Sequence, residues 1–242
     1  ALLQYEIDTH LLELTQRYGH DAAAAAYLAC AEAIPALGEV AHGLKDVDFQ
    51  RMDSLYLASR TRDVPRLMAE GDARRSIGLD ARWLGPDALR ERFDVAGGGA
   101  LLTRQAARVD PYRLTYALLQ RVRRRGGHVH DRTVLHTLTP STRGVSACTE
   151  DGATLRARHV VLAMGYANQQ WLQQRVARNR SSYAFITDPI DTDLLGRLRN
   201  TMVWESARPY LYLRATGDHR LLVGGLDDAI DIPARRDRRV QR

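Results

Sequence analysis

Helical patterns dominate the first part of the chain. An alanine-rich run at 22–28 follows Asp21, an acidic residue suited to cap the N-terminus of a helix. Pro35 lies further along the same stretch, and we expect it to kink or divide the helix. Two shorter helices are predicted over 65–77 and 86–92.

A further helix is predicted to begin with Asp110 as its N-cap and Pro111 as its first helical residue. Gly126 and Gly127 follow this helix and mark its end. Its apolar stripe consists of Leu114, Ala117, Leu118, Leu119 and Val122. One face of this helix is therefore apolar.

Strand patterns occupy much of the rest of the chain. The segments 54–58, 128–138 and 145–149 each contain a predicted strand, and Asp151-Gly152 is predicted to form a hairpin turn. Val160 to Ala163 is a continuous apolar run, which fits a strand buried on both faces of a parallel sheet. An antiparallel sheet is predicted from the four later segments 184–187, 202–204, 210–214 and 220–224.

The order of these elements predicts a mixed α/β (α+β) fold. A helical region comes first, a helix, hairpin and buried strand follow, and a β-rich region comes last, so we expect two interleaved domains. The first domain is expected to comprise 1–43 and 105–177, and the second 44–104 and 178–232. The residues 233–242 form a basic tail in this prediction.

The formal net charge of +6 changes this prediction little. Arginine supplies almost all of the basic side chains, with Lys45 the only lysine, and the runs 121–125 and 235–242 are short. No aromatic residues interleave with the first run, so a solvated helix end is favoured over a nucleic-acid contact. A basic nucleic-acid-binding module is kept as an alternative, and the favoured interpretation has no nucleic-acid partner.

The two cysteines, Cys30 and Cys148, have neither a metal-ligand spacing nor a disulfide framework, which favours a cytoplasmic protein. We find no apolar run long enough to span a bilayer and no signal-peptide pattern. His128 and His130 share a predicted strand face with His136 nearby, but no further ligand follows at a suitable spacing. No metal site is therefore predicted, and no P-loop or nucleophile elbow occurs.

Several motifs, taken in order, resemble a known family. Val-Asp-Pro-Tyr-Arg-Leu at 109–114, the helix and strand that follow it, and His-Val-Val-Leu-Ala-Met-Gly at 159–165 form the first part of the resemblance. They are similar to the FAD-dependent oxidoreductases related to D-amino-acid oxidase, glycine oxidase and sarcosine oxidase. Arg-Pro-Tyr-Leu-Tyr-Leu-Arg at 208–214, followed by 220–225, resembles the substrate-domain hairpin of the same family. The similarity covers most of the chain.

The resemblance implies a discontinuous FAD-binding domain of dinucleotide-fold type, formed by 1–43 and 105–177, with an interleaved β-rich substrate domain. It also implies that FAD is the cofactor. The implied reaction oxidises the C–N bond of a small amine or amino acid to an imine by hydride transfer to the flavin. The cofactor performs this chemistry, and no catalytic side chain is evident in the sequence.

Cofactor-binding residues follow from the same resemblance. The opening segment 1–8 resembles the loop that passes the flavin ring, and Gly165 stands where a side chain would block the cofactor. The backbone N–H and C=O of Val134 would meet the adenine edge. The full set of candidates is Leu2, Leu3, Gln4, Val134, Ala163 and Gly165.

Substrate-binding residues are expected on the aromatic strand near the C-terminus. Tyr210, Tyr212 and Arg214 share one strand face, and such a face with a nearby cation can receive a carboxylate. Ordinary cross-strand packing explains Tyr212 and Arg214 at least as well, so Tyr210 is the chosen candidate. Gly224 and Gly225 are candidates for close approach of substrate, with a tight turn as the alternative.

The Gly-rich motif G-x-G-x-x-G, whose helix N-terminus holds the pyrophosphate in dinucleotide folds, does not occur in the 242 residues. The family's C-terminal Gly-rich segment is not found in them either. We therefore expect this chain by itself to bind FAD weakly or not at all. A non-catalytic fragment of such a flavoprotein is a further alternative function.

Overall fold

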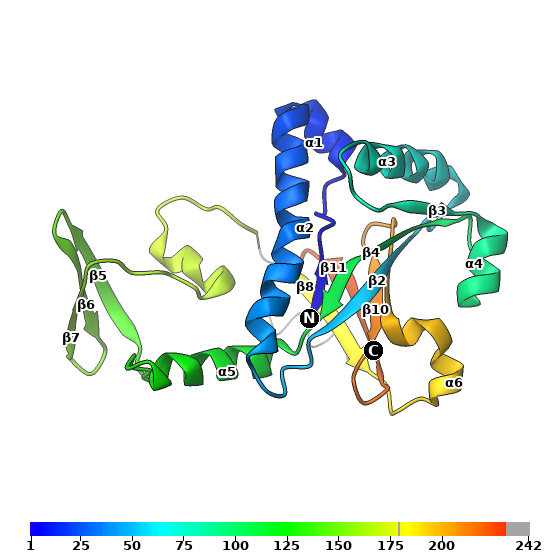
Figure 1. The fold of residues 1–242 in the computed structure, drawn as a ribbon. Coiled ribbons are helices and arrows are strands. Elements are labelled where there is room, and N and C mark those ends of the chain that lie inside the picture. Colours follow the sequence, from blue (N-terminus) through cyan, green and yellow to red (C-terminus); the bar gives the residue numbers. More distant parts are fainter. Residues whose placement is uncertain (179, 231–242) are drawn as a thin grey trace. The chain divides into compact units, whose positions relative to one another are not determined.

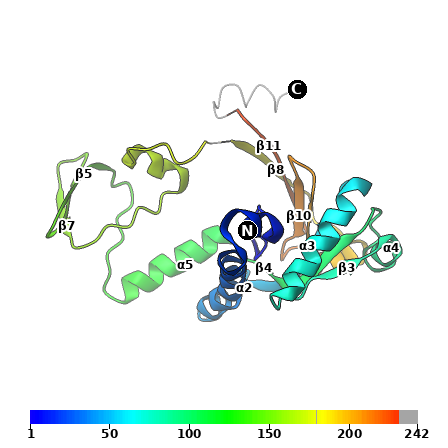
Figure 2. The ribbon, with the colours of Figure 1, turned by 90° about the horizontal axis from the view of Figure 1, so that it is seen from above.

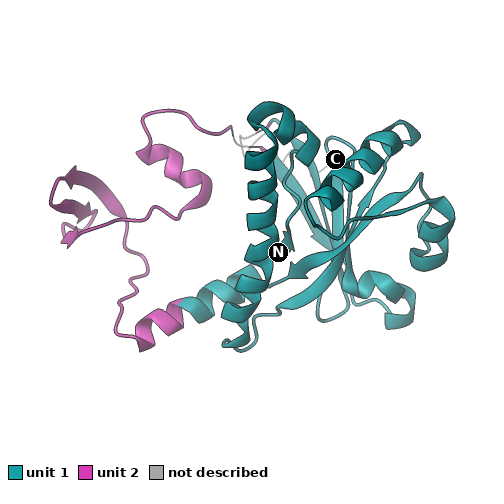
Figure 3. Cartoon of the chain, turned by 45° about the horizontal axis from the view of Figure 1, so that its top comes forward, with its two compact units in different colours: residues 1–118, 181–229 teal, residues 119–180, 230–242 magenta. Residues whose placement is uncertain are grey.

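The computed structural model describes residues 1–178 and 180–230 and divides them between two compact units. Unit 1 contains 1–118 and 181–229, and the described residues of unit 2 are 119–178, 180 and 230 (Figure 3). The boundary between the units falls inside one helix. The predicted basic tail at 233–242 lies outside the described residues, and the predicted assignment of domains to cofactor and substrate stays a prediction.

Unit 1 is a mixed sheet with helices packed on it (Figure 1). Its helices are α1 (Leu11–Tyr18), α2 (His20–His42), α3 (Val64–Ser76), α4 (Pro86–Phe93), the start of α5 (Pro111–Arg124) and α6 (Thr192–Leu195), with 3-10 turns at Thr61–Asp63 and Gly196–Asn200. Its strands are β1 (Leu2–Gln4), β2 (Gln50–Leu57), β3 (Arg82–Leu84), β4 (Ala100–Arg108), β8 (Ser181–Ile186), β9 (Thr201–Glu205), β10 (Leu211–Ala215) and β11 (Leu221–Asp228).

The strands of unit 1 form one eight-stranded sheet in the order β1-β4-β2-β9-β10-β11-β8, with β3 paired to β4. The β2–β9 pair is parallel and places Tyr56 opposite Trp204, whereas the other pairs are antiparallel. The predicted antiparallel arrangement of the four late strands is therefore confirmed. The mixed α/β fold class is confirmed as well.

Apolar side chains on both faces of this sheet form the core of unit 1. Leu55, Leu102 and Val203 lie together in one cluster, and Tyr56, Leu101 and Trp204 lie in another. These two sets alternate along β2, β4 and β9, as the period of two in a strand requires. The sheet is therefore covered on both faces over its central strands.

The helix α2 packs on the core through Tyr27, Ala31 and Ile34, and Ala41 is buried beyond Pro35. Because buried residues hold the helix on both sides of the proline, α2 runs unbroken from His20 to His42, so Pro35 does not divide it. The expected kink at Pro35 stays a prediction. By length and composition alone, α2 also qualifies as a candidate membrane span, with 22% of the tested window buried in the protein.

The helix α3 lies beside β3 and β4, as the view from above shows (Figure 2). It begins with Pro65 in its first turn, and α4 likewise begins with Pro86. Both helices match the sequence prediction to within one residue at each end. Gly71 of α3 lies so close to Leu101 that an added Cβ would approach its Cδ2 to 2.5 Å, which sets how near α3 comes to the sheet.

Unit 2 contains a small antiparallel sheet of β5 (Leu135–Ser141), β6 (Gly144–Thr149) and β7 (Thr154–Ala157), followed by a 3-10 turn at Gly165–Trp171. The predicted turn at Asp151-Gly152 is confirmed, because β6 and β7 pair across it. The Gly152 φ of +89° is a left-handed value that favours glycine.

The predicted buried strand at 160–163 is wrong. These residues form no strand, and Val161 has 86% of its side chain exposed. A strand buried on both faces needs a neighbouring strand and covering elements. Among the described residues of unit 2, the only sheet is β5–β6–β7, and it does not include this segment.

The helix α5 starts as predicted, since the Asp110 carboxylate accepts a hydrogen bond from the Arg113 backbone N–H at 3.0 Å. None of its described residues is buried, however, and Leu119 and Val122 are 40% and 45% exposed. The apolar stripe is thus covered only in part, since Leu114, Ala117 and Leu118 are half-buried.

Candidate functional site

The strand β1 carries the first three candidate residues at the edge of the sheet. Leu2, Leu3 and Gln4 pair with residues of β4, so this segment is ordered by backbone hydrogen bonds. Leu2 packs against the cluster of Met52, Ala106 and Met202, whereas Leu3 packs against the separate cluster that contains Tyr27. The structure therefore separates Leu2 from Leu3 on opposite faces of β1.

Gln4 has a buried amide oxygen without a hydrogen-bond partner among the described residues. A buried acceptor without a donor costs free energy, and native proteins satisfy nearly all such groups. By alternation along β1, Gln4 lies on the same sheet face as Leu2. The orphaned oxygen marks this part of the face as a place where a ligand with an N–H donor would be stabilised.

A buried ionic cluster fixes the segment that follows β1. The Arg74 guanidinium is fully buried, pairs with Glu70 at 2.8 Å and lies 3.6 Å from a Glu6 oxygen. Burial raises the pKa of Glu6, and Arg74 opposes this shift. For Glu70, the effect of burial on the pKa is outweighed by Arg74 and by the backbone N–H groups of Leu11 and Leu12, so the pKa is lowered.

The same Glu70 carboxylate caps α1, since the backbone N–H groups of Leu11 and Leu12 donate to its two oxygens at 2.8 and 3.1 Å. His10, which immediately precedes the helix, places its Nε2 3.0 Å from the Tyr56 hydroxyl oxygen. Burial lowers the pKa of His10 to about 4. This imidazole is therefore neutral at physiological pH.

Tyr210 lies where this fixed segment meets the start of β10. Its hydroxyl donates to Asp8 at 3.4 Å, and the Arg208 guanidinium lies 4.9 Å from its ring centroid. The ring also contacts Trp204 edge to face, at 6.4 Å between centroids. Burial raises the pKa of Tyr210 and the Asp8 carboxylate raises it further, so the phenol keeps its proton and remains a hydrogen-bond donor.

A cavity of about 260 Å³ includes Asp8 and Arg208, which both contact Tyr210, in its lining. It is lined by Asp8, His10, Glu13, Tyr56, Asp63, Arg66, Leu67, Ser206 and Arg208. Two of its charged groups pair with each other, since Arg66 lies 3.3 Å from Glu13, and the Ser206 hydroxyl donates to Asp63 at 2.7 Å. A small polar molecule would meet both signs of charge here.

Gly224 and Gly225 are buried in β11, and protein atoms alone explain why they are glycines. A Cβ on Gly224 would lie 2.4 Å from the Tyr212 hydroxyl oxygen, and one on Gly225 would lie 2.0 Å from the Tyr210 carbonyl oxygen. The aromatic strand β10 therefore packs directly on the β11 backbone. A substrate contact at these glycines stays a prediction.

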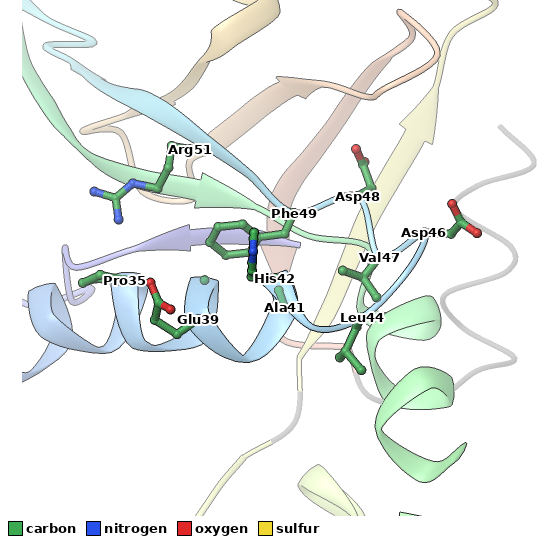
Figure 4. A pocket seen from close by; sticks show the side chains of 11 residues that line it. Pro35, Glu39, Ala41, His42, Leu44, Asp46, Val47, Asp48, Phe49 and Arg51 are labelled. Atoms are coloured by element: carbon green, nitrogen blue, oxygen red, sulfur yellow. The ribbon is translucent and has the colours of Figure 1, made fainter. Parts of the chain in front are cut away.

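The loop between α2 and β2 separates two larger cavities of unit 1. One, of about 560 Å³, is lined by Glu39 and His42 of α2 and by Phe49 and Arg51 at the start of β2, among others (Figure 4). These polar side chains are half-buried or exposed, so nothing in this cavity demands a ligand. The other, of about 830 Å³, is bordered by Arg214 of β10.

The remaining cofactor candidates belong to unit 2 and are exposed. Val134 directly precedes β5, and its carbonyl oxygen accepts a hydrogen bond from the Glu150 N–H at 3.0 Å. Ala163 lies in the segment that forms no strand, and Gly165 begins a 3-10 turn with a φ of +58°. No atom lies within 4 Å of the position that a Gly165 Cβ would take, which leaves room for a ligand.

Sequence reasoning missed the partners of Tyr210 and the isolation of Arg214. Asp8 and Arg208 are exposed charged residues whose meeting with Tyr210 depends on the tertiary fold. Arg214 was visible in the sequence as a cation on the same strand face as Tyr212 and Tyr210. Its lack of a counter-charge becomes visible only in the structure.

The family defined as FAD dependent oxidoreductase (DAO) matches residues 9–242. The chain belongs to this family. No curated protein matches the sequence.

Solved structures share the fold. Glycine oxidase from Geobacillus kaustophilus is 20% identical, with a TM-score of 0.71 over 94% of this chain and 60% of the other. Glycine oxidase from Bacillus cereus is 16% identical, with a TM-score of 0.66 over 94% and 59%. L-alpha-glycerophosphate oxidase from Mycoplasma pneumoniae, solved with FAD bound, is 12% identical, with a TM-score of 0.67 over 94% and 60%. The chain thus spans about three fifths of the length of these proteins.

Proposed function

We propose that the protein containing this chain is an FAD-dependent oxidoreductase that oxidises the C–N bond of a small amine or amino acid. Family membership over 9–242 supports the cofactor and the general reaction. Two of the similar structures are glycine oxidases, which supports a C–N substrate, whereas the glycerophosphate oxidase makes a C–O substrate the main competing possibility.

The observation that carries the proposal is the orphaned Gln4 amide oxygen on a sheet face next to Leu2. FAD fits this acceptor, because its ring presents an N–H group that can donate a hydrogen bond to the buried amide oxygen. In this proposal Leu2 and Gln4 hold the ring edge. The assignment of Gly165 to the cofactor is a separate prediction about unit 2. When bound, FAD would take the hydride from the carbon next to the substrate nitrogen, which leaves an imine.

The protein's own contribution on the substrate side is binding and orientation. Tyr210 keeps its proton and can donate a hydrogen bond to the substrate, and Asp8 orients its hydroxyl. The buried cluster of Arg74, Glu70 and Glu6 holds the segment that carries Asp8. This rigidity keeps the donor in place before the substrate arrives.

The test uses the full-length protein, purified and saturated with FAD. We expect a visible flavin spectrum that bleaches when glycine, sarcosine or another amine is added without oxygen. Bleaching by glycerol 3-phosphate alone would overturn the C–N assignment. Absence of flavin binding would support the non-catalytic alternative, and salt-sensitive retention on DNA in its place would support a nucleic-acid-binding module.

Two variants test the flavin-binding and the substrate-binding residues separately. Gln4→Ala should weaken flavin binding, because it removes the acceptor, whereas Tyr210→Phe should change amine kinetics and leave the flavin content unaltered. Tyr18→Phe is the matched control, since Tyr18 is 69% exposed on α1. If Tyr210→Phe and Tyr18→Phe behave alike in turnover and KM, Tyr210 has no part in substrate binding.

A further inference from the structure

The strand β8 is an open edge of the sheet in unit 1. Among the described residues it pairs with β11 alone, and the strand order of the sheet ends there. Such an edge presents a row of backbone N–H and C=O groups to any strand that can reach it. Proteins usually protect their edges with charged residues, with proline or by keeping the edge strand short.

β8 has none of these three protections. Its sequence, Ser-Ser-Tyr-Ala-Phe-Ile at 181–186, contains no charged residue and no proline. The strand β1 at the opposite end of the strand order and the strand β3 beside β4 have three residues each, whereas β8 has six. Phe185 and Ile186, which lie on opposite faces of β8, are 63% and 53% exposed. The edge is therefore long, uncharged and open on both faces near its C-terminal end.

The pairing with β11 decides which backbone groups of β8 remain available. The Thr187 N–H donates to the Leu221 carbonyl oxygen at 3.0 Å, and the register of the two strands continues this pairing along β8. The direction of hydrogen bonding alternates along an antiparallel strand, so the odd-numbered residues face β11. Three residues consequently turn their N–H and C=O groups toward the open edge: Ser182, Ala184 and Ile186.

The backbone of this edge is complementary to a second copy of itself. When two copies of β8 lie antiparallel and centred on Ala184, each Ala184 is opposite the other, and Ser182 is opposite Ile186 of the second copy. All three outward-facing residues of each strand then form hydrogen-bonded pairs, and the bonds to β11 stay intact. A shift of the register by two residues would leave one of these pairs unformed within the strand.

The side chains favour the same register. Tyr183 is opposite Phe185 of the second copy, in a closely spaced pair of the kind that aromatic residues stabilise in sheets. The exposed Arg180 directly precedes β8, and Asp188 follows its end, so the two opposite charges face each other across the pair. The Asp188 side chain lies 3.6 Å from Arg220 but is fully exposed, which leaves it accessible to a second cation.

We propose that two copies of this protein associate edge to edge through β8, with a two-fold axis at Ala184 that joins their sheets. Self-complementarity of backbone, aromatic residues and charge in one register identifies the partner as a second copy. An interface in which the same patch serves both copies is closed, so the product is a dimer. The dimer is independent of the proposed function, because an inactive protein would form it equally well.

The test is a charge exchange at Ala184, measured by sedimentation equilibrium of the full-length protein. Ala184 is exposed, so circular dichroism and Tm should be unchanged in Ala184→Lys and Ala184→Glu. Each variant alone should dimerise at least about tenfold more weakly than the wild type, because like charges meet at the two-fold axis. An equimolar mixture of the two variants should regain the dimer as a 1:1 pair.

Ala157→Lys is the matched control, since it places the same charge at an exposed alanine of β7 and should leave the dimer unaltered. A monomeric wild type, dimers that survive both Ala184 substitutions, or an equal loss in Ala157→Lys would overturn the proposal. A mixture that does not regain the dimer would overturn it as well, because restoration by the opposite charge requires Ala184 of both copies to meet.

Discussion

The two units differ in how far their side chains find partners within the chain. Unit 1 has four clusters of buried apolar residues and a fully buried ionic cluster around Arg74. In the described part of unit 2, only Ala147 and Thr149 are buried, while Val134, Val161 and other large apolar side chains are exposed. An apolar pattern in a sequence therefore predicts a core only where the covering elements are also present.

The same difference in packing separates two groups of candidate site residues. The candidates of unit 1, including Gln4 and Tyr210, lie on paired strands or beside them, and their polar neighbours are held by the core. The candidates of unit 2, Val134, Ala163 and Gly165, lie in exposed segments outside strands. We infer that the candidates of unit 1, on the cofactor side as well as the substrate side, are ordered in advance, whereas the cofactor candidates of unit 2 have little packing to fix them.

The largest difference between the units is expected from a matched pair of arginine substitutions. Arg74→Ala should lower the free energy of unfolding by about 3–5 kcal/mol, because it leaves Glu6 and Glu70 buried without their counter-charge. Arg156→Ala, at an exposed position of β7, should change it by less than about 0.5 kcal/mol. Urea unfolding followed by circular dichroism measures the free energy of unfolding of both variants. Similar decreases in the two variants would contradict the difference in packing between the units.

A matched pair of leucines tests the apolar contribution. Leu55→Ala in β2 removes a fully buried side chain and should cost about 3 kcal/mol. Leu155→Ala in β7 truncates a side chain that is 48% exposed and should cost less than about 1 kcal/mol. A cost at Leu155 that approaches the cost at Leu55 would reveal packing in unit 2 that the structure lacks.

The pH dependence of unit 1 tests the buried His10. Its pKa is lowered from 6.5 to about 4 in the fold, so between these values the unfolded chain binds a proton that the folded protein does not. Stability is therefore lost as the pH falls through this window, by on the order of 2 kcal/mol. The difference in unfolding free energy between wild type and His10→Gln, measured from pH 7 to pH 4, isolates this contribution, and a difference that is constant with pH would contradict it.

The smallest effect is expected at the boundary between the units. Asp110→Ala removes the cap of α5 and should cost about 1 kcal/mol if the start of this helix belongs to the cooperative structure of unit 1. Thr115→Ala, on the exposed side of the same helix, is the control. If Asp110→Ala leaves the free energy of unfolding unchanged, the whole of α5 lies outside the cooperative structure of unit 1.

Sequence patterns predicted the elements of unit 1 well, because alternation and proline or aspartate caps are local properties. The strands β8 to β11 and the helices α3 and α4 all appear where expected. The parallel pairing of β2 with β9 joins segments far apart in the chain, and no local pattern encodes it. The same holds for the contact of Asp8 with Tyr210.

The errors have related causes. The run at 160–163 has the composition of a buried strand, but burial depends on neighbours that the run itself does not specify. Pro35 removes one helical hydrogen bond, yet the buried residues on both sides of it keep α2 continuous. The orphaned atoms of Gln4 and Arg214 were beyond sequence reasoning, since lack of a partner is a property of the tertiary structure.

Hydrogen exchange of the 242-residue chain, read residue by residue, tests the central contrast between the units most directly. The amides of β2, β4 and β9 should open only with global unfolding, whereas those of β5, β6 and β7 should exchange about a thousandfold faster relative to their intrinsic rates. Equal protection in the two units would contradict the account. It would show that the residues of unit 2 are as firmly packed as the core around Tyr56 and Trp204.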